Sequence, residues 1–418
     1  LEHHARHLLA TGRVAAGREQ ATRAARAHRR AEAFERAVQI LEEALRVEIN
    51  PRRRFELAIE ASDTLEEAGD PERSLRLIEP FLKDSEVALT PAERVQALRR
   101  IGVACHRAGQ PRKALDAFAK AQEGSDSKRD AEELVFVDSE LAEVHIFLGS
   151  LEAAEEACVR GLKRIEEEEV SEPARGRFEV MLRASLGHIE LRKLSLERAR
   201  HELERALELS RRHGTIGDRA AILHNLGVAE NQLNQFPRAR RRFLEAERLL
   251  LRAGERRNTV KIATNLALIE AKLGRREDAR RHLEQAEDLL RRHPGERLEC
   301  FALYSRGLVA NLFGEVEEAA RALEAAAAAS RRLGDRSLAA FAEIALVEAY
   351  LASGRYADAE ARLASLSRRN VPDHLPVLRR MTWARLCLLE ALLGDLPRAR
   401  RLSRRLEADA RTDVVFLE

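Results

Sequence analysis

A 40-residue repeat dominates the sequence. Similar nine-residue segments surround a turn residue at Asn234, Gly274, Gly314, Gly354 and Gly394. The same register continues upstream through Leu194, Gly149, Gly109 and Gly69, with one irregular step of 45 residues between Gly149 and Leu194. A fixed period of this length indicates a repeat architecture. We therefore expect nine related units in one array rather than two or three unrelated globular domains.

Each unit carries a small residue at two fixed positions. Seven positions before the turns stand Ser62, Gly102, Ala142, Gly187, Gly227, Ala267 and Gly307, with Val347 and Cys387 as looser fits. Five positions after the turns stand Ser74, Ala114, Ala154, Ala199, Ala239, Ala279, Ala319, Ala359 and Ala399. Apolar residues at helical spacing flank each turn, and small side chains let two helices approach closely. Each unit is thus predicted to be two antiparallel helices joined by a left-handed Gly or Asn turn.

A pattern of small, small, large and small residues spans the two predicted helices. It is seen in Leu226-Gly227 with Ala239, Phe243 and Ala246, and again in Ile101-Gly102 with Ala114, Phe118 and Ala121. This pattern resembles the tetratricopeptide repeat (TPR), although that repeat has about 34 residues. The longer period is similar to that of kinesin light chains and of the C-terminal TPR sensor regions of large bacterial ATP-dependent regulators. The resemblance implies an all-α, right-handed α-solenoid of antiparallel helix pairs.

The resemblance also suggests how the chain is divided. Residues 1–31 are expected to form N-terminal lead-in or capping helices, residues 32–410 a solenoid of about ten helix pairs, and residues 411–418 a C-terminal tail. Residues 7–45 look like the junction at which such regulators pass from a nucleotide-binding module into their repeats. This implies an upstream effector domain, without which an ATP-regulated switch cannot be assigned. The 45-residue step falls at the acidic run 166–173, where we expect an extended loop.

Composition excludes several classes of protein. The longest stretch without a charged residue, 220–229, is about half of what a bilayer-spanning helix requires, so no membrane partner is expected. The four cysteines lie far apart and there is no secretory signal, which predicts a cytoplasmic protein. A net charge of +3 provides no broad positive field, and the basic runs 238–242 and 398–405 lack interleaved aromatics. Nucleic acid is therefore not an expected partner.

Motifs for catalysis are missing from the sequence. Residues 12–17 begin and end with glycine, but Arg18 and Glu19 stand where a phosphate loop needs Lys and a hydroxyl. His3 and His7 are one helical turn apart without a nearby third metal ligand. No zinc-protease or nucleophile-elbow pattern occurs. We expect no enzymatic activity, no metal and no cofactor.

The first helices of such an array line its concave wall, and two of them carry amides in phase. Asn225 and Asn265 each stand nine positions before a turn, and each amide can donate to and accept from a peptide backbone. The predicted peptide-binding site is completed by His224, Asn231, Lys261, Thr264, Lys272, Tyr304 and Asn311. The alternative is that these asparagines only keep a solvent-facing stripe polar.

Two further stripes share the same offsets. The N-terminal stripe is acidic, followed by a basic one, and comprises Glu56, Glu60, Asp63, Glu66 and Glu67, then Arg99, Arg100, His106 and Arg107. Opposed patches of this kind orient a charged peptide, but a solvated helix face explains them as well. The C-terminal stripe is apolar and comprises Phe301, Leu308, Leu312, Phe341, Leu388 and Leu392. It is expected to be covered by residues 414–417, by a partner helix or by a second copy of the chain.

These features together predict a non-catalytic protein- or peptide-binding scaffold that holds an extended segment in its concave groove. The family resemblance implies that it is the sensor or partner-recognition region of a larger bacterial signalling protein. The alternative is a structural module that self-associates through the apolar C-terminal stripe.

Overall fold

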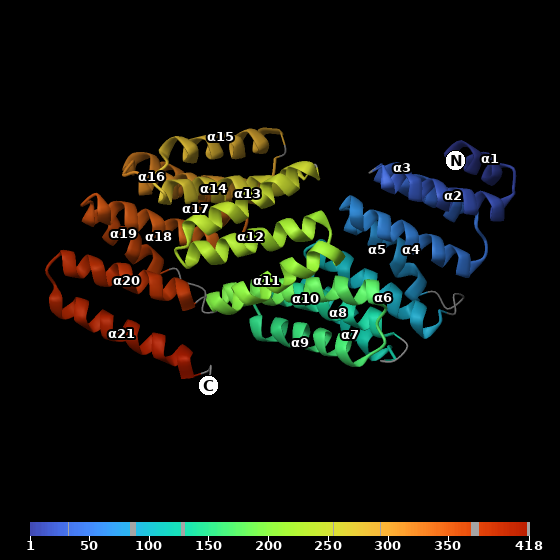
Figure 1. Ribbon diagram of the computed structural model, residues 1–418, viewed down its shortest axis with the longest axis horizontal. Coiled ribbons are helices and arrows are strands. Elements are labelled where there is room, and N and C mark those ends of the chain that lie inside the picture. Colours follow the sequence, from blue (N-terminus) through green and yellow to red (C-terminus); the bar gives the residue numbers. More distant parts are fainter. Residues whose placement is uncertain are drawn as a thin grey trace. The chain divides into compact units, whose positions relative to one another are not determined.

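The chain folds as helical hairpins (Figure 1). The computed structural model describes residues 1–31, 33–83, 89–126, 130–253, 255–292, 294–368 and 376–415, and within these ranges it contains helices α1 to α21 and no strand. No helix in these ranges is long and apolar enough to cross a bilayer. The residues form two compact units, Leu1–His213 and Gly214–Glu418. The prediction of an all-α solenoid of antiparallel helix pairs is confirmed.

Unit 1 is the compact unit Leu1–His213. Its helices are α1 (Glu2–Ala10), α2 (Val14–Arg30), α3 (Phe34–Val47), α4 (Pro51–Ala68), α5 (Pro71–Lys83), α6 (Pro91–Arg107), α7 (Pro111–Glu123), α8 (Ala131–Leu148), α9 (Leu151–Glu167), α10 (Glu172–Arg192) and α11 (Leu196–His213). The predicted turns join α4 to α5, α6 to α7, α8 to α9 and α10 to α11. One apolar cluster is shared by α1, α2, α3 and α4. The division of the chain at residues 31 and 32 stays a prediction.

Unit 2 is the compact unit Gly214–Glu418. Its helices are α12 (Ile216–Gln232), α13 (Phe236–Arg252), α14 (Arg256–Lys272), α15 (Arg276–Arg292), α16 (Glu296–Leu312), α17 (Val316–Arg332), α18 (Arg336–Ala352), α19 (Tyr356–Arg368), α20 (Pro376–Leu392) and α21 (Leu396–Val415). Each consecutive pair is one hairpin, whose first helix precedes the turn and whose second helix follows it. The side chains of residues 408–418, including the predicted tail, lie outside the described residues.

The turn residues adopt the left-handed backbone that the sequence predicts. Gly274 has a φ of 75°, and Asn234 and Leu194 take φ values of 58° and 62° at the equivalent positions. The amides after the turn bond back to carbonyls in the last turn of the first helix, as Gln235 does to Glu230 over 2.7 Å. These bonds satisfy carbonyl groups that would otherwise lack partners at the helix end.

Close approach of the two helices in a hairpin depends on the small residue before the turn. A Cβ atom placed on Gly227 would lie 2.6 Å from Cε1 of Phe243, and one on Gly102 would lie 2.4 Å from the same atom of Phe118. Both rings are fully buried. The small residue seven positions before the turn therefore accommodates the large residue nine positions after it, as dense core packing requires.

The expectation of an extended loop at residues 166–173 is wrong. Helix α9 continues to Glu167 and α10 begins at Glu172, so four residues connect them. The additional length lies mostly in α10, which has 21 residues where α12 has 17. Pro173 causes no break because it stands in the first turn of α10, where its missing N–H removes no intrahelical bond.

Candidate functional site

Three of the predicted site residues form one hydrogen-bonded cluster between the first helices α12 and α14. Nδ2 of Asn265 donates to Nε2 of His224 over 2.9 Å, and Nδ1 of His224 donates to Oδ1 of Asn225 over 3.3 Å. One ring nitrogen accepts and the other donates, which is the pattern of a neutral imidazole. All three side chains are partly exposed. His224 thus links the two asparagines that the repeat places on neighbouring helices. We call these three residues the asparagine cluster.

The asparagine cluster keeps unused hydrogen-bonding capacity. Among the described residues, the Nδ2 donors of Asn225 and the Oδ1 acceptor of Asn265 have no partner. A peptide unit offers one N–H donor and one C=O acceptor. The cluster therefore presents the complement of a peptide unit at a partly exposed position.

A second polar bridge joins the same two helices. Nζ of Lys272 donates to Oδ1 of Asn231 over 2.8 Å and lies 5.0 Å from the ring centroid of Phe236. Burial lowers the pKa of Lys272. Asn231 follows His224 by seven residues, and Lys272 follows Asn265 by seven, so both bridges lie on the same helix faces. A rise of 1.5 Å per residue separates them by about 10 Å.

Four predicted site residues lie outside these two bridges. Thr264 is only 4% exposed and its hydroxyl donates to the carbonyl oxygen of Lys261, so it presents no polar group to a ligand. Lys261 itself is exposed, and its pKa is lowered by desolvation and by repulsion from Arg297. On α16, burial raises the pKa of Tyr304 to about 12, and Asn311 is partly exposed. Within the described part of the chain, none of these four side chains forms a hydrogen bond with Asn225 or Asn265.

Comparable bridges recur between other neighbouring first helices. They join the residue nine positions before one turn to the residue six positions before the preceding turn, in the pairs Arg100–Asp63, Ser185–Glu143 and Arg385–Glu348. Arg107 and Arg192, two positions before their turns, each donate over 2.6 Å to a carbonyl oxygen of the preceding first helix. These bridges were not apparent from the sequence. The bridging residues stand at constant offsets from the turns, but their residue types differ from one repeat to the next. The predicted site positions therefore also link repeats.

The acidic stripe expected on α4 is paired with arginines of the helices beside it. The pairs are Glu60–Arg26, Glu67–Arg29, Asp63–Arg100 and Glu66–Arg107, at 3.0, 2.5, 2.7 and 3.0 Å. A cavity of about 360 Å³ lies between α2, α4 and α6, with Arg26, Phe55 and Glu60 among its lining residues. The charges interlock across three helices, so this part of unit 1 does not present separate acidic and basic patches.

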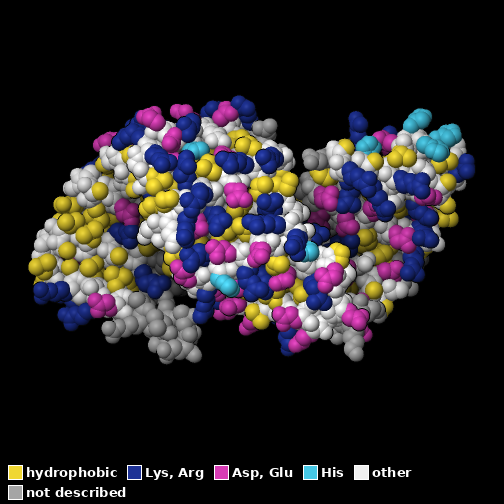
Figure 2. Space-filling view, in the orientation of Figure 1, with side chains coloured by type: hydrophobic (Ala, Val, Ile, Leu, Met, Phe, Trp, Pro, Cys, Tyr) yellow, Lys and Arg dark blue, Asp and Glu magenta, His cyan; other side chains and the backbone are white. Residues whose placement is uncertain are grey.

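The C-terminal apolar stripe is only partly exposed. Leu312, Leu388 and Leu392 are 50%, 50% and 47% exposed, whereas Phe301, Leu308 and Phe341 pack against buried clusters. Leu393 and Leu396 extend the exposed part through the last turn. Figure 2 shows hydrophobic side chains gathered over α19 and α20. The predicted cover by residues 414–417 lies outside the described residues.

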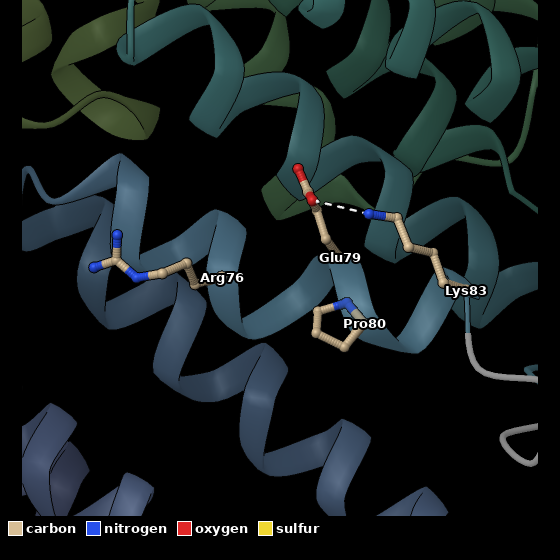
Figure 3. Close-up of a pocket in the computed structure, with 4 residues that line it drawn as sticks. All are labelled: Arg76, Glu79, Pro80 and Lys83. Atoms are coloured by element: carbon tan, nitrogen blue, oxygen red, sulfur yellow. Dashed lines mark hydrogen bonds and ion pairs between the residues drawn. The ribbon is translucent and has the colours of Figure 1, made fainter.

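A surface hollow lies on α5 and is unrelated to the predicted site. It measures about 420 Å³ and is lined by Arg76, Glu79, Pro80 and Lys83, all on one helix (Figure 3). Glu79 and Lys83 form an ion pair one helical turn apart, at 3.4 Å. No second element contributes a side chain among the described residues, so within them the hollow brings together no functional groups from different helices.

The residues considered for metal binding do not assemble into a site. Within the part of the chain that the structure describes, no group of three or more His, Cys, Asp or Glu side chains is placed to hold a metal ion. His3, His4 and His7 are exposed on α1.

Family comparisons agree with the repeat register. Tetratricopeptide-repeat models match residues 59–129 and 218–292. The second match runs from the start of α12 to the end of α15, which is two consecutive hairpins with the asparagine cluster between them. The chain therefore contains tetratricopeptide repeats in both matched segments. No curated protein matches the sequence of this TPR protein.

The TPR protein shares its fold with several solved structures. Aspartyl phosphate phosphatase F from Bacillus subtilis matches with a TM-score of 0.59 and 13% identity, over 84% of this chain and 94% of that chain. The apo form of the quorum sensor NprR from B. thuringiensis matches at 0.58 and 14%, over 84% and 96%. A Rap protein complexed with Competence and Sporulation Factor matches at 0.53 and 16%, over 96% and 99%.

Proposed function

We propose that this TPR protein is a non-catalytic scaffold that binds an extended protein or peptide segment along the first helices of unit 2. The observation that carries the proposal is the asparagine cluster. His224 holds two amides so that the Nδ2 group of Asn225 and Oδ1 of Asn265 have no partner among the described residues. Stacked repeats present long binding surfaces rather than a single catalytic cleft, which supports binding over catalysis.

The cluster suggests how the segment is held. The free Nδ2 of Asn225 donates to a backbone carbonyl of the ligand, and Oδ1 of Asn265 accepts from a backbone N–H. Such contacts hold a chain whatever its side chains are. An extended chain advances about 3.3 Å per residue, so the Lys272–Asn231 bridge stands roughly three ligand residues away. Burial disfavours the charged form of Lys272, which lowers its pKa. A carboxylate of the ligand at that point would stabilise the protonated ammonium group and so bind favourably there.

A sensor or partner-recognition role in a larger bacterial signalling protein is part of the same proposal. It draws support from the solved structures of similar fold, one of which is named a quorum sensor and another of which is in complex with Competence and Sporulation Factor. A third is named a phosphatase. The proposal predicts that this chain releases no phosphate from acyl phosphates under conditions in which it binds its peptide.

A peptide array tests the site. The full chain is used to select ligands, which are then measured against Asn225→Ala with Asn265→Ala. Losing two hydrogen bonds of about 1 kcal/mol each weakens binding roughly thirtyfold. The control is Gln285→Ala, which removes an amide from the second helix α15, where it bonds to Glu247. Unchanged affinity in the double asparagine variant, or equal loss in the control, would count against the site.

Self-assembly is the second candidate function, and the exposed leucines favour it. Leu312, Leu388 and Leu392 are about half exposed on first helices of unit 2. A second copy of the chain that buries them gains about 25 cal/mol for each Å² of apolar area covered. Light scattering of the full chain distinguishes this function. A mass that rises with concentration and falls in Leu388→Ser with Leu392→Ser supports it, and a constant monomer mass excludes it.

A further inference from the structure

A basic pocket that uses none of the asparagine-cluster residues lies where α12 meets α13. Its cavity of about 500 Å³ is lined by Arg219, Arg241, Leu244, Glu245, Arg248, Leu249 and Arg252. Four arginines and one glutamate give it an excess of positive charge. Two leucines give the same pocket an apolar wall. We call this the arginine pocket.

The four arginines of the pocket have no acidic partner among the described residues. On the same helix α13, by contrast, Arg240 and Arg242 pair with the buried carboxylates of Glu270 and Glu230. In addition, Nε of Arg219 is buried and has no hydrogen-bond acceptor. A buried donor without a partner is costly and uncommon in folded proteins. Arg219 thus contributes to the pocket lining a guanidinium whose Nε has no acceptor among the described residues.

The 40-residue register provides an internal comparison. The residues equivalent to Arg241 and Arg252 in the next hairpin are also arginines, Arg281 and Arg292. There, Arg281 pairs with Asp278 over 2.8 Å and Arg292 pairs with Asp288 over 2.7 Å.

The positions of those two aspartates are occupied by arginine in the pocket hairpin. Arg238 replaces the equivalent of Asp278, and Arg248 replaces the equivalent of Asp288. Arg281 and Arg292 are therefore neutralised by aspartates in one hairpin. The equivalent Arg241 and Arg252 have no acidic partner among the described residues.

Helix electrostatics explain only part of this charge. Arg252 stands in the last turn of α13, where a cation is favourable beside the exposed carbonyls. Arg241 and Arg248 lie further from that end, so the macrodipole does not account for them. Asp218, the neighbour of Arg219 in sequence, is engaged with Thr215 in the capping box of α12.

We propose that the arginine pocket binds a phosphate monoester. A phosphate ester carries about −1.5 to −2 charges and three acceptor oxygens, which matches several guanidinium groups better than one carboxylate does. The cavity exceeds the size of a bare phosphate, and Leu244 and Leu249 provide apolar contact for the group that carries it. The described residues that line the pocket include no aromatic side chain, so they offer no platform for stacked bases.

Titration calorimetry on the full chain at constant ionic strength tests this proposal. The probes are free O-phosphoserine, the peptide Ala-Leu-phosphoserine-Leu-Ala, the same peptide with serine or glutamate, and oligothymidylate. The expected result is binding of a phosphoserine probe at least tenfold tighter than the serine and glutamate peptides. Preference for the phosphopeptide over free phosphoserine identifies a modified protein as the source of the phosphate, and equal affinity identifies a small phosphorylated metabolite.

The matched variants are Arg241→Gln with Arg252→Gln in the pocket, and Arg281→Gln with Arg292→Gln in the next hairpin. The pocket variant should weaken phosphoserine binding at least tenfold, because charged hydrogen bonds are lost. The control variant should stay within twofold. If circular dichroism shows that the pocket double variant does not fold, the exposed Arg248→Gln replaces it.

Three outcomes overturn the proposal. The first is that neither phosphoserine probe saturates the wild-type chain. The second is that the pocket and control variants weaken binding equally, which indicates a bulk charge effect. The third is that oligothymidylate binds more tightly than the phosphopeptide with the same dependence on the pocket arginines, which indicates a nucleic-acid surface.

Discussion

The contact between Gly227 and Phe243 gives the sharpest test of the helix-pair geometry. A Cβ at position 227 would lie 2.6, 2.7 and 2.8 Å from three ring atoms of Phe243, whose side chain is fully buried. Overpacking of this kind costs about 1–3 kcal/mol. Replacing glycine with alanine inside a helix returns about 1 kcal/mol. Gly227→Ala should therefore destabilise the α12–α13 hairpin by about 1 kcal/mol.

The next hairpin shows how the clash is relieved. Its equivalent residues are Ala267 and Leu283, a larger residue before the turn and a smaller one after it. In a Phe243→Leu background, most of the clash with an alanine at position 227 should be absent, while the gain in helix propensity remains. Adding Gly227→Ala to that background should therefore be neutral or should stabilise the hairpin by up to about 1 kcal/mol.

Native-state hydrogen exchange is the appropriate assay, because long repeat arrays do not unfold in a single two-state step and local opening can be followed helix by helix. Amides of α12 and α13 should exchange about fivefold faster in Gly227→Ala and no faster when it is added to Phe243→Leu. Gly124→Ala is the control, because its Cβ would meet nothing closer than 3.4 Å. Equal acceleration by Gly227→Ala in both backgrounds would refute the geometric argument.

Three more predictions concern turns and buried charges. Gly274→Ala should destabilise its hairpin by about 1 kcal/mol in native-state hydrogen exchange because φ is +75°, while Gly274→Asn should cost less. Glu270→Ala should destabilise the packing of α13 on α14 by about 1.5–3 kcal/mol in hydrogen exchange, because it removes the carboxylate that Arg240 and Arg275 share. Burial, with repulsion from nearby acids, raises the pKa of Glu140 to about 7, so the folded state binds this proton more tightly than the unfolded state and the residue reduces stability as pH rises from about 4.5 to 7. Glu140→Gln should therefore raise the melting temperature at pH 8 and leave it unchanged at pH 4. Glu208→Gln, at an exposed position, should leave it unchanged at both pH values.

The fold was predictable from the sequence because each hairpin repeats the same local pattern of turn, small and apolar residues. A turn residue such as Gly274 and a small residue such as Gly227 recur at fixed offsets, and local helical periodicity then sets the helices. The 45-residue step was misread as a loop because its acidic run and Pro173 look like loop composition. In the structure, that proline serves as part of a helix start.

The site was predictable only in outline. The register placed Asn225 and Asn265 on neighbouring helices, but it could not show that His224 joins them or that Lys272 is already bonded to Asn231. Those contacts depend on the distance between helices, which a one-dimensional pattern does not contain. Thr264 illustrates the same limit. It directly precedes Asn265 and so lies about 100° away from it around the helix axis, where its side chain is buried.

The arginines of the basic run 238–242 have different surroundings in the folded chain. Arg240 and Arg242 turn toward buried carboxylates, Arg238 donates to Gln235, and Arg241 lines the arginine pocket. The sequence identified the run but could not separate the two arginines that pair with buried carboxylates from Arg241, which lines the pocket.

The binding account is tested most directly by the side-chain amides of the asparagine cluster. The full chain, labelled with nitrogen-15 only at asparagine, is titrated with a peptide selected on the array. The account predicts that the side-chain NH₂ signals of Asn225 and Asn265 shift together and saturate with the peptide, while those of Asn50, the cap of α4 in unit 1, stay in place. Saturation of peptide binding with unmoved Asn225 and Asn265 signals would contradict it.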